Sequence, residues 1–490
     1  MGRKSGILLH ISSLPSRYGI GTLGKEAYRF IDFLVKAKQK VWQMLPLGPT
    51  GYGDSPYQSF SVFAGNPYFI DLDMLKEDNL LTEAELEKSG LPKKIGNIDY
   101  GILFEKRIPV LKLAFNRGYN PNDKAYISFV ENNAEWLYDY SFFAAIKDYL
   151  NHIPLSEWPL PLKTRDTEAM HSYGLKLEKE INLHRYIQYL FFKQYTLLKD
   201  YAAKKGILLF GDLPFYPSPD SSDVWSWPQD FQLDQKTTAQ KASAGVPPDY
   251  FSEDGQVWGN PLYNWEQQKI EGYRWWLLRF AQQSKLYDML RIDHFRGLHT
   301  FFSIPYKDTT ARNGHWEIGP GIEFVKLIKD SFPNLKIVAE DLGDLDEGVK
   351  QFVKDSGLAC MYVYQFAFDS VDSNYLPHNH NKNAVVYTGT HDNDTLKGFL
   401  SGRTKGARLA RRYFNLTNRQ TEVFDMIRIG MSSVADLFIA PIQDYLELPG
   451  SARLNTPSTT FGNWQFRIGE DDLSDSLARK IAEITLLYSR

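Results

Sequence analysis

The sequence is poor in cysteine, in long apolar runs and in charge of one sign. Its 490 residues include one cysteine, Cys360, so no disulfide can form within the chain and a reducing compartment is expected. The 56 basic and 59 acidic residues give a net charge of −3, which offers no electrostatic reason to expect nucleic acid or an anionic membrane as a partner. No stretch approaches the roughly twenty apolar residues that span a bilayer. The apolar run at residues 7–9 is too short for a signal peptide, so a cytoplasmic location is expected.

Aromatic residues, by contrast, are abundant: 11 Trp, 29 Tyr and 31 Phe make up 14% of the chain. One interpretation is a large hydrophobic core, which the hydrophobic content of 43% can supply. The other is a cleft lined by flat rings, on which the apolar C–H faces of sugars can stack. The composition does not decide between these two interpretations.

Eight short apolar segments alternate with longer amphipathic ones, a pattern typical of buried parallel strands connected by helices. The expected strands are residues 6–10, 41–47, 206–212, 289–293, 336–340, 361–366, 384–390 and 437–440. Helical patterns lie between several of them, at residues 25–38, 183–204, 265–284, 322–330 and 345–354. Eight such units predict an α/β fold, the (β/α)8 TIM barrel.

The chain is longer than the about 250 residues of a plain barrel, so it must carry insertions. We expect a single catalytic barrel over residues 1–490, with a helical insertion subdomain at 74–161 after the second strand. Residues 214–261, rich in Pro, Gly, Ser, Asp and Trp, are expected to form a second, irregular insertion. Long irregular loops tend to be functional, and the loop at 245–265 is a candidate lid over the active site. The fold class is therefore a TIM barrel with large, mainly helical insertions.

Acidic residues stand at the ends of four predicted strands. Asp212, Asp293, Glu340 and Asp392 close the third, fourth, fifth and seventh strands. Active sites of TIM barrels lie at the C-terminal ends of the strands, so these side chains are expected to meet at one rim. Paired carboxyl groups suit glycosidic-bond chemistry, in which one protonates the leaving oxygen while the other attacks or stabilises an oxocarbenium-like carbon.

The two reacting carboxyl groups need different protonation states at one pH. Arg291 precedes Asp293 by two residues, so both side chains point to the same side of a strand, and the positive charge is expected to keep Asp293 ionised. Glu340 has no basic neighbour in the sequence and is the better candidate for a raised pKa and for the proton. Asp341, the next residue, is expected to face away from it.

Other interpretations of these residues stay open at this point. Arg291 and Asp293, taken alone, suit an ion pair of the barrel core about as well as a catalytic pair. Residues 340–346 resemble a loose calcium loop, but the spacing misses the required pattern and a strand-to-helix turn is the better alternative. His294 and His391 are alternative candidates for metal ligands, although the paired histidines at short spacing that are typical of such sites are absent.

Six segments together resemble the amylomaltases, which are the 4-α-glucanotransferases of the α-amylase clan. They are GYGDSPYQSFSVFAGNPYFIDL (51–72), GDLPFY (211–216), GVPPDYFSEDGQVWGNPLYNW (245–265), RIDHFRG (291–297), AEDLG (339–343) and THDNDT (390–395). The resemblance covers nearly the whole chain. RIDHFRG alone would indicate only the wider clan, whereas GYGDSPYQ together with the 245–265 segment is specific to this family.

The resemblance implies roles for individual residues. Asp293 would be the nucleophile, Glu340 the general acid/base, and Asp392 a third carboxylate that stabilises the transition state. The residues implied to bind or orient substrate are Tyr57, Asp249, Trp258, Asn260, Pro261, Arg291, His294 and His391. Asp212 joins this set as the acid that closes the third strand. No metal or organic cofactor is expected.

The implied activity is transfer of α-1,4-glucan segments between maltooligosaccharides, maltodextrins or amylose, through a covalent glycosyl-enzyme at Asp293. The reaction would retain the anomeric configuration, which predicts that the two carboxyl groups lie about 5–5.5 Å apart. Cyclisation of long glucans is a further expectation. An α-1,4-glucan hydrolase of the amylase type is the alternative, because water competes with the acceptor for the same intermediate. A non-catalytic glucan-binding barrel is a third hypothesis, and the three intact carboxylates count against it.

Overall fold

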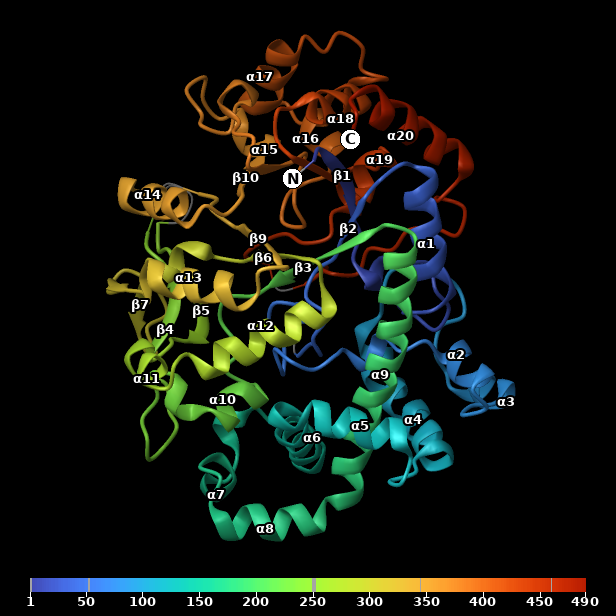
Figure 1. Cartoon of the computed structure of the whole chain (residues 1–490), viewed down its shortest axis with the longest axis vertical. Helices are drawn as coiled ribbons and strands as arrows, with labels where there is room; N and C mark the ends of the chain where they lie inside the picture. The colour runs from blue at the N-terminus through green and yellow to red at the C-terminus, as the bar shows by residue number, and fades with distance from the viewer. Residues whose placement is uncertain (1, 52, 249–252, 344, 460) are drawn as a thin grey trace.

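The computed structural model describes residues 2–51, 53–248, 253–343, 345–459 and 461–490. Eight parallel strands form a nearly closed sheet surrounded by helices (Figure 1). In sheet order they are β10 (Cys360–Val363), β11 (Ala384–Tyr387), β12 (Leu437–Pro441), β1 (Lys4–Leu8), β2 (Val41–Gln43), β3 (Leu208–Leu213), β6 (Met289–Ile292) and β9 (Lys336–Ala339). The predicted TIM barrel is confirmed, and each of the eight predicted segments overlaps one of these strands.

The barrel interior is filled by apolar side chains from all eight strands. They are Leu8, Val41, Phe210, Met289, Val338, Ala359, Met361, Val363, Val385, Tyr387, Leu437 and Ile439. Because strand side chains alternate between two faces, the residue two positions further along faces the same interior. Three charged residues stand two positions after interior residues in this way: Asp212 after Phe210, Arg291 after Met289, and Glu340 after Val338. The alternation that builds the core therefore also places charged groups above it.

The outer faces of the strands pack against amphipathic helices. In α1 (Lys25–Lys36), for example, Phe30, Ile31 and Leu34 are buried, while Lys36 is exposed and pairs with Asp475. Further helices between or after the barrel strands include α9 (Glu178–Lys204), α12 (Arg274–Leu286), α13 (Gly321–Ser331), α14 (Glu347–Ser356), α15 (Tyr364–Ala367), α16 (Leu396–Ser401), α17 (Lys405–Phe414), α18 (Glu422–Ser432), α19 (Ile442–Tyr445) and α20 (Asp475–Leu487). Within the described ranges, no helix has the length and hydropathy needed to cross a membrane.

The stretch predicted as one helix at 265–284 is in fact two helices, α11 (Trp265–Ile270) and α12. Gly272 and Tyr273, which lie between them, both have positive φ, at 66° and 58°. A right-handed helix cannot include such residues. The apolar pattern continues across the break, which is why the sequence did not reveal it.

Most of the connection between β2 and β3 is helical. It comprises α2 (Leu72–Glu77), α3 (Glu83–Lys88), α4 (Tyr100–Gly118), α5 (Lys124–Asn132), α6 (Ala134–Tyr149), α7 (Leu160–Lys163) and α8 (Thr167–Lys176), before α9 leads into β3. Figure 1 shows α4 to α8 grouped at one end of the molecule, away from α17 and α18. Buried aromatic side chains on α6, including Trp136, Phe142 and Phe143, pack in the same core as those on α9.

The segment at 214–261 was expected to be irregular, and this is wrong where it forms one helix and two strands. It contains α10 (Ser222–Ser226) and the strands β4 (Ala242–Val246) and β5 (Gln256–Pro261), which join β7 (Thr300–Pro305) and β8 (His315–Ile318) in an antiparallel sheet of order β5-β4-β7-β8. β4 consists mainly of small residues, and β5 ends in Gly259, Asn260 and Pro261, all of which are poor strand signals. Proline is tolerated here because β5 is an edge strand.

The close approach of β1 and β2 generates a stability prediction. A Cβ atom at Gly6 would lie 2.4 Å from the Val41 carbonyl oxygen and 2.6 Å from the Val41 Cβ. Gly6→Ala is therefore expected to lower the free energy of unfolding by about 1–3 kcal/mol in urea denaturation, as overpacking does. Gly96→Ala is the matched control, because a Cβ there meets no atom within 4 Å. Equal losses in the two variants would contradict this explanation.

Candidate active site

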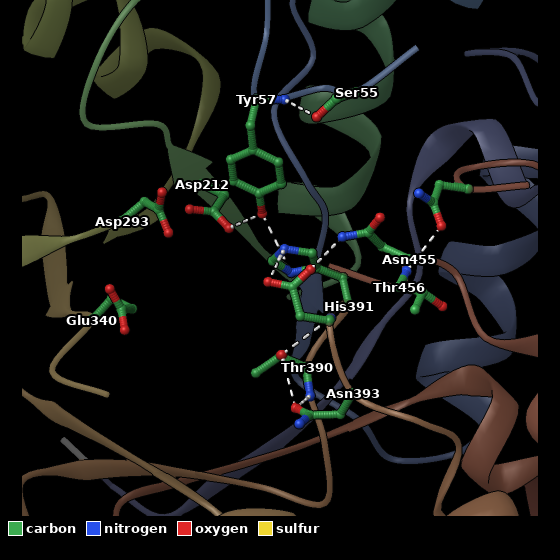
Figure 2. A network of polar contacts seen from close by, with 12 residues as sticks. Ser55, Tyr57, Asp212, Asp293, Glu340, Thr390, His391, Asn393, Asn455 and Thr456 are labelled. Atoms are coloured by element: carbon green, nitrogen blue, oxygen red, sulfur yellow. Dashed lines mark hydrogen bonds and ion pairs between the residues drawn. The ribbon is translucent and has the colours of Figure 1, made fainter. Parts of the chain in front are cut away.

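Strand register brings four charged residues together at one end of the barrel. Asp212 on β3 is the register partner of Arg291 on β6. Ile292 on β6 pairs with Ala339 on β9, so Asp293 and Glu340, the next residues, leave neighbouring strands at the same level. Such strands are about 4.8 Å apart. Figure 2 shows the carboxyl groups of Asp293 and Glu340 on the same side of the site, with Asp212 beside Tyr57.

Arg291 binds two of these carboxylates at once. Its Nη1 atom lies 2.8 and 2.9 Å from the two carboxylate oxygens of Asp212, and 2.8 Å from Asp293 Oδ1. The side chain of Arg291 is 7% exposed and that of Asp293 is 30% exposed. Burial alone would lower the pKa of Arg291, but the two carboxylates raise it well above its usual value, so the guanidinium stays charged. The expectation that Arg291 and Asp293 share one side of the strand is confirmed.

Asp212 lies further inside the barrel than the sequence indicated. β3 continues to Leu213, so Asp212 is inside the strand and its side chain is 1% exposed. Its carboxylate accepts hydrogen bonds from Arg291 and, at Oδ2, from the Tyr57 hydroxyl at 2.8 Å. The strand ends one residue later than predicted, so Asp212 lies just inside it, but it still meets Arg291 at the predicted end of the barrel. Asp212 supports Arg291 and Tyr57 from beneath the site.

Glu340 is held by backbone donors on both sides of its carboxyl group. Its Oε2 accepts a hydrogen bond from the His294 N–H at 2.7 Å, and its Oε1 accepts one from the Leu342 N–H at 3.0 Å. Burial is the main cause that raises the pKa of Glu340 to about 7. Arg291 and the two N–H groups oppose this shift, and Asp293 adds to it. The direction is the one expected from the sequence, and it places Glu340 among groups that exchange a proton near neutral pH.

A chain of polar contacts extends from Asp212 through Tyr57 and His391 to Asp392, and Figure 2 shows its part from Asp212 to His391. The Tyr57 hydroxyl lies 3.3 Å from His391 Nδ1, and the two rings are stacked with centroids 4.9 Å apart. His391 Nε2 lies 3.3 Å from Asp392 Oδ2, while Asn455 Nδ2 donates to Asp392 Oδ1 at 2.6 Å. Both ring nitrogens of His391 thus have partners inside the protein.

The pKa values of His391 and Asp392 follow from this contact. Burial lowers the pKa of His391, but the charge of Asp392, the hydrogen bond to it and the charge of Asp212 together raise the pKa above its usual value. Burial raises the pKa of Asp392, but His391 and Asn455 outweigh it and the pKa lies well below its usual range. Asp392 is therefore an anion whose orientation is fixed from two sides, and its side chain is still 44% exposed to the cleft.

His294 contacts aromatic side chains. Its backbone is left-handed, with φ 48° and ψ 47°, which turns the chain so that its N–H meets Glu340. Its ring lies edge-on to that of Trp258 on β5, with centroids 4.9 Å apart. Burial, followed by the charge of Arg296, lowers the pKa of His294 to about 3, so the imidazole is neutral and its buried Nε2 has no hydrogen-bond partner among the described residues.

Two other expected binding residues lie in the antiparallel sheet, at the end of β5. Asn260 is buried, and both ends of its amide have partners: Nδ2 donates to the Pro217 carbonyl at 2.8 Å and Oδ1 accepts from Gln58 at 3.1 Å. Pro261 is buried at the end of β5, opposite Ser243. Asp249 lies outside the described residues. The third expected residue of β5, Trp258, contacts His294, whose N–H binds Glu340.

The sequence did not indicate two residues that complete the site. Asn455 orients Asp392, and the ring of Trp464 lies 6.1 Å from that of Tyr57 and 5.9 Å from that of His391. Both belong to a segment after the last barrel strand that has no strand or helix periodicity. Only tertiary packing brings this segment to the rim, so no spacing in the sequence points to it.

The buried position of Arg291 generates a second prediction. Arg291→Met would leave Asp212 buried without its cation, so the free energy of unfolding is expected to fall by about 3–5 kcal/mol in urea denaturation. Adding Asp212→Asn removes the unpaired charge, and the double variant is expected to recover a large part of this loss while remaining inactive. A single variant as stable as the unmodified protein would contradict the proposed electrostatic role of Arg291.

Comparison with known proteins identifies the family of this chain. A sequence model described as 4-alpha-glucanotransferase matches residues 9–472. A 4-alpha-glucanotransferase from Clostridium butyricum is 46% identical over 485 residues, covering 98% of this chain and 100% of the relative. One from Streptococcus pneumoniae serotype 4 is 42% identical, covering 100% and 97%. The amylomaltase from Streptococcus agalactiae in complex with acarbose has a TM-score of 0.96 at 39% identity, covering 100% of this chain and 99% of that one. This chain belongs to the 4-alpha-glucanotransferase family.

Proposed function

We propose that the chain transfers α-1,4-linked glucan segments from one maltooligosaccharide to another by a retaining double displacement. The observation that carries the mechanism is the register of β6 and β9, which sets Asp293 and Glu340 side by side in contrasting environments. Asp293 contacts a buried guanidinium, whereas Glu340 has a pKa of about 7. A nucleophile and a proton donor require this contrast.

In the first step, the Asp293 carboxylate attacks the anomeric carbon of the donor glucan. Glu340 delivers its proton to the glycosidic oxygen, so the departing chain leaves as a free 4-hydroxyl and an ester forms at Asp293. Asp392, held by His391 and Asn455, binds hydroxyl groups of the distorted sugar and stabilises the positive charge that develops on it. Tyr57 lies beside Asp212 and His391, where its ring can contact the same sugar.

In the second step, Glu340 is a carboxylate and accepts the proton of the 4-hydroxyl of an acceptor glucan. The acceptor oxygen attacks the anomeric carbon, the ester bond to Asp293 breaks, and the anomeric configuration is retained. The pKa of about 7 suits both halves of the cycle, since Glu340 must give up and regain one proton. Arg291 remains bound to Asp293 as the ester forms and breaks.

Transfer rather than hydrolysis requires that water be kept from the ester. We infer that the segment 245–265 acts as a lid, supported by Trp258, whose ring lies against His294 beside Glu340. The names of the relatives support transfer over hydrolysis. The acarbose complex of the streptococcal amylomaltase supports an oligosaccharide as the ligand of this cleft. Maltodextrins and amylose are the proposed substrates, and cyclisation of long glucans would follow when the acceptor is the far end of the same chain.

We infer that the helical insertion at 74–161 is a subdomain that braces the cleft-lining segment 51–72. Arg107 on α4 is completely buried and donates from Nη2 to the carbonyl oxygens of Tyr68, at 2.9 Å, and Ile70. Lys147 on α6 lies 2.5 Å from Asp220, in the segment after β3. The insertion thus contacts two of the connections that form the rim.

Incubation with maltotriose tests the proposed activity. A transferase is expected to produce glucose together with a ladder of maltooligosaccharides longer than the substrate, because each glycosyl group passes to another sugar. Chromatography of the products over time measures this. Glucose and maltose alone, with no longer product, would show a hydrolase and contradict the proposal.

The raised pKa of Glu340 predicts the pH dependence of the first step. Glu340 must be protonated to act as the acid, so kcat/KM is expected to be full below pH about 7 and to fall about tenfold per pH unit above it. Initial rates between pH about 5 and 9 measure this fall in kcat/KM. Glu340→Gln is expected to lower kcat about a thousandfold with dextrin binding preserved, whereas Glu347→Gln, at an acid that is 90% exposed on α14, is expected to change neither. A rate that stays flat to pH 9 would exclude Glu340 as the acid.

A further inference from the structure

The barrel has one seam, between β9 and β10. The other neighbouring strands pair along their lengths, but these two share a single bridge, Val338 with Ala359. The Ala339 N–H donates to the Ala359 carbonyl at 2.9 Å. In a parallel ladder that continued, the next hydrogen bond would run from the Met361 N–H to the Ala339 carbonyl. Glu340 follows directly at this point.

A side chain replaces that missing bond. The Met361 N–H donates instead to Oδ1 of Asp341, at 2.8 Å. Asp341 therefore supplies the acceptor that the backbone of β9 would have supplied, from two residues further along the chain. The strands separate, yet the chain beyond Glu340 stays attached to β10. This contact also explains why Asp341 faces away from Glu340, as the strand period predicts.

Glu340 is consequently fixed from two directions. On the β6 side, the Glu340 N–H donates to the Ile292 carbonyl at 3.0 Å, and its carbonyl accepts from the Phe295 N–H at 3.2 Å. On the β10 side, the tether is the side chain of Asp341. Between the two tethers, the Leu342 N–H reaches the carboxyl group of Glu340 at 3.0 Å.

We propose that Asp341 is a positioning residue for Glu340: by bonding the Met361 N–H across the seam, it holds the turn in which the Leu342 N–H meets the Glu340 carboxyl group. This rests on the proposed role of Glu340 as acid/base. Both N–H donors favour the charged form of Glu340, so releasing the turn raises its proton affinity and misplaces its proton. Asp341 itself does not touch the substrate.

The titratable groups around Asp341 do not obscure the change in the proton affinity of Glu340. Cys360, Tyr362 and Tyr375 surround it, and burial raises the pKa of Cys360 to about 12 and those of both tyrosines higher still, so all three stay neutral while Glu340 titrates. Burial also raises the pKa of Asp341 to about 6. Replacing Asp341 by asparagine removes this titration but keeps an oxygen acceptor for the Met361 N–H.

The test compares Asp341→Asn, which keeps the acceptor, with Asp341→Ala, which removes it. With maltotriose, the Asn variant is expected to keep kcat within about threefold. The pH at which its kcat/KM begins to fall, here called the upper limb of the pH profile, is expected to stay unchanged. The Ala variant is expected to lose about tenfold to a hundredfold in kcat with KM little changed, and to shift the upper limb upward by about one pH unit. Asp355→Ala, at an exposed acid of α14, is the matched control and is expected to shift nothing.

Thermal melting shows whether each variant is folded. If the Ala variant is not, Asp341→Ser takes its place, since the serine hydroxyl is too short to reach the Met361 N–H. A folded Ala or Ser variant with an unshifted upper limb overturns the inference, and so does an Asn variant that shifts the limb as far as Ala. Failure of the proposed function is distinct, because it would appear in Glu340→Gln, which would then retain its turnover.

Discussion

The buried ion cluster of Arg291 with Asp212 and Asp293 is the interaction on which the site depends. Charges removed from water are tolerated only when they are paired and hydrogen-bonded. Arg291 meets this condition with contacts of 2.8–2.9 Å to both acids. Through Asp212 the cluster also fixes Tyr57 and His391 (Figure 2). Beyond them, His391 contacts Asp392. One cation therefore anchors polar groups from several separate parts of the chain.

Two neighbouring carboxyl groups differ because their surroundings differ. Asp293 lies beside the guanidinium, and its side chain is 30% exposed. Glu340, one strand away, is bound by N–H groups in a setting where burial raises its pKa to about 7. The third acid, Asp392, is an anion oriented by His391 and Asn455. The protein thus obtains three distinct carboxyl groups from strand register, burial and a few hydrogen bonds. Glycosyl transfer with retention requires two of them, a nucleophile and an acid/base.

The sequence predicted the parts of the molecule that depend on local periodicity. Buried parallel strands are continuous apolar runs, so all eight were found, and the period of two correctly placed Arg291 with Asp293 and turned Asp341 away. Prediction from the sequence failed where tertiary packing determines the local structure. The antiparallel sheet was missed because β4 and β5 carry small residues, glycine and proline. The end of β3 was placed one residue too early, because the pairing of Leu213 with Ile292 extends the strand. Asn455 and Trp464 come from a segment without periodicity and reach the site only by packing.

The most direct test of the central claim is to observe the ester at Asp293. With an α-maltosyl fluoride, fluoride leaves without a proton, so the Glu340→Gln variant can form the intermediate but lacks the base that discharges it to an acceptor. Mass spectrometry of a protease digest is expected to show a maltosyl adduct on the peptide that contains Asp293, and none in a variant that also carries Asp293→Asn. An adduct on another residue, or turnover of the fluoride with inversion and no adduct, would contradict the account.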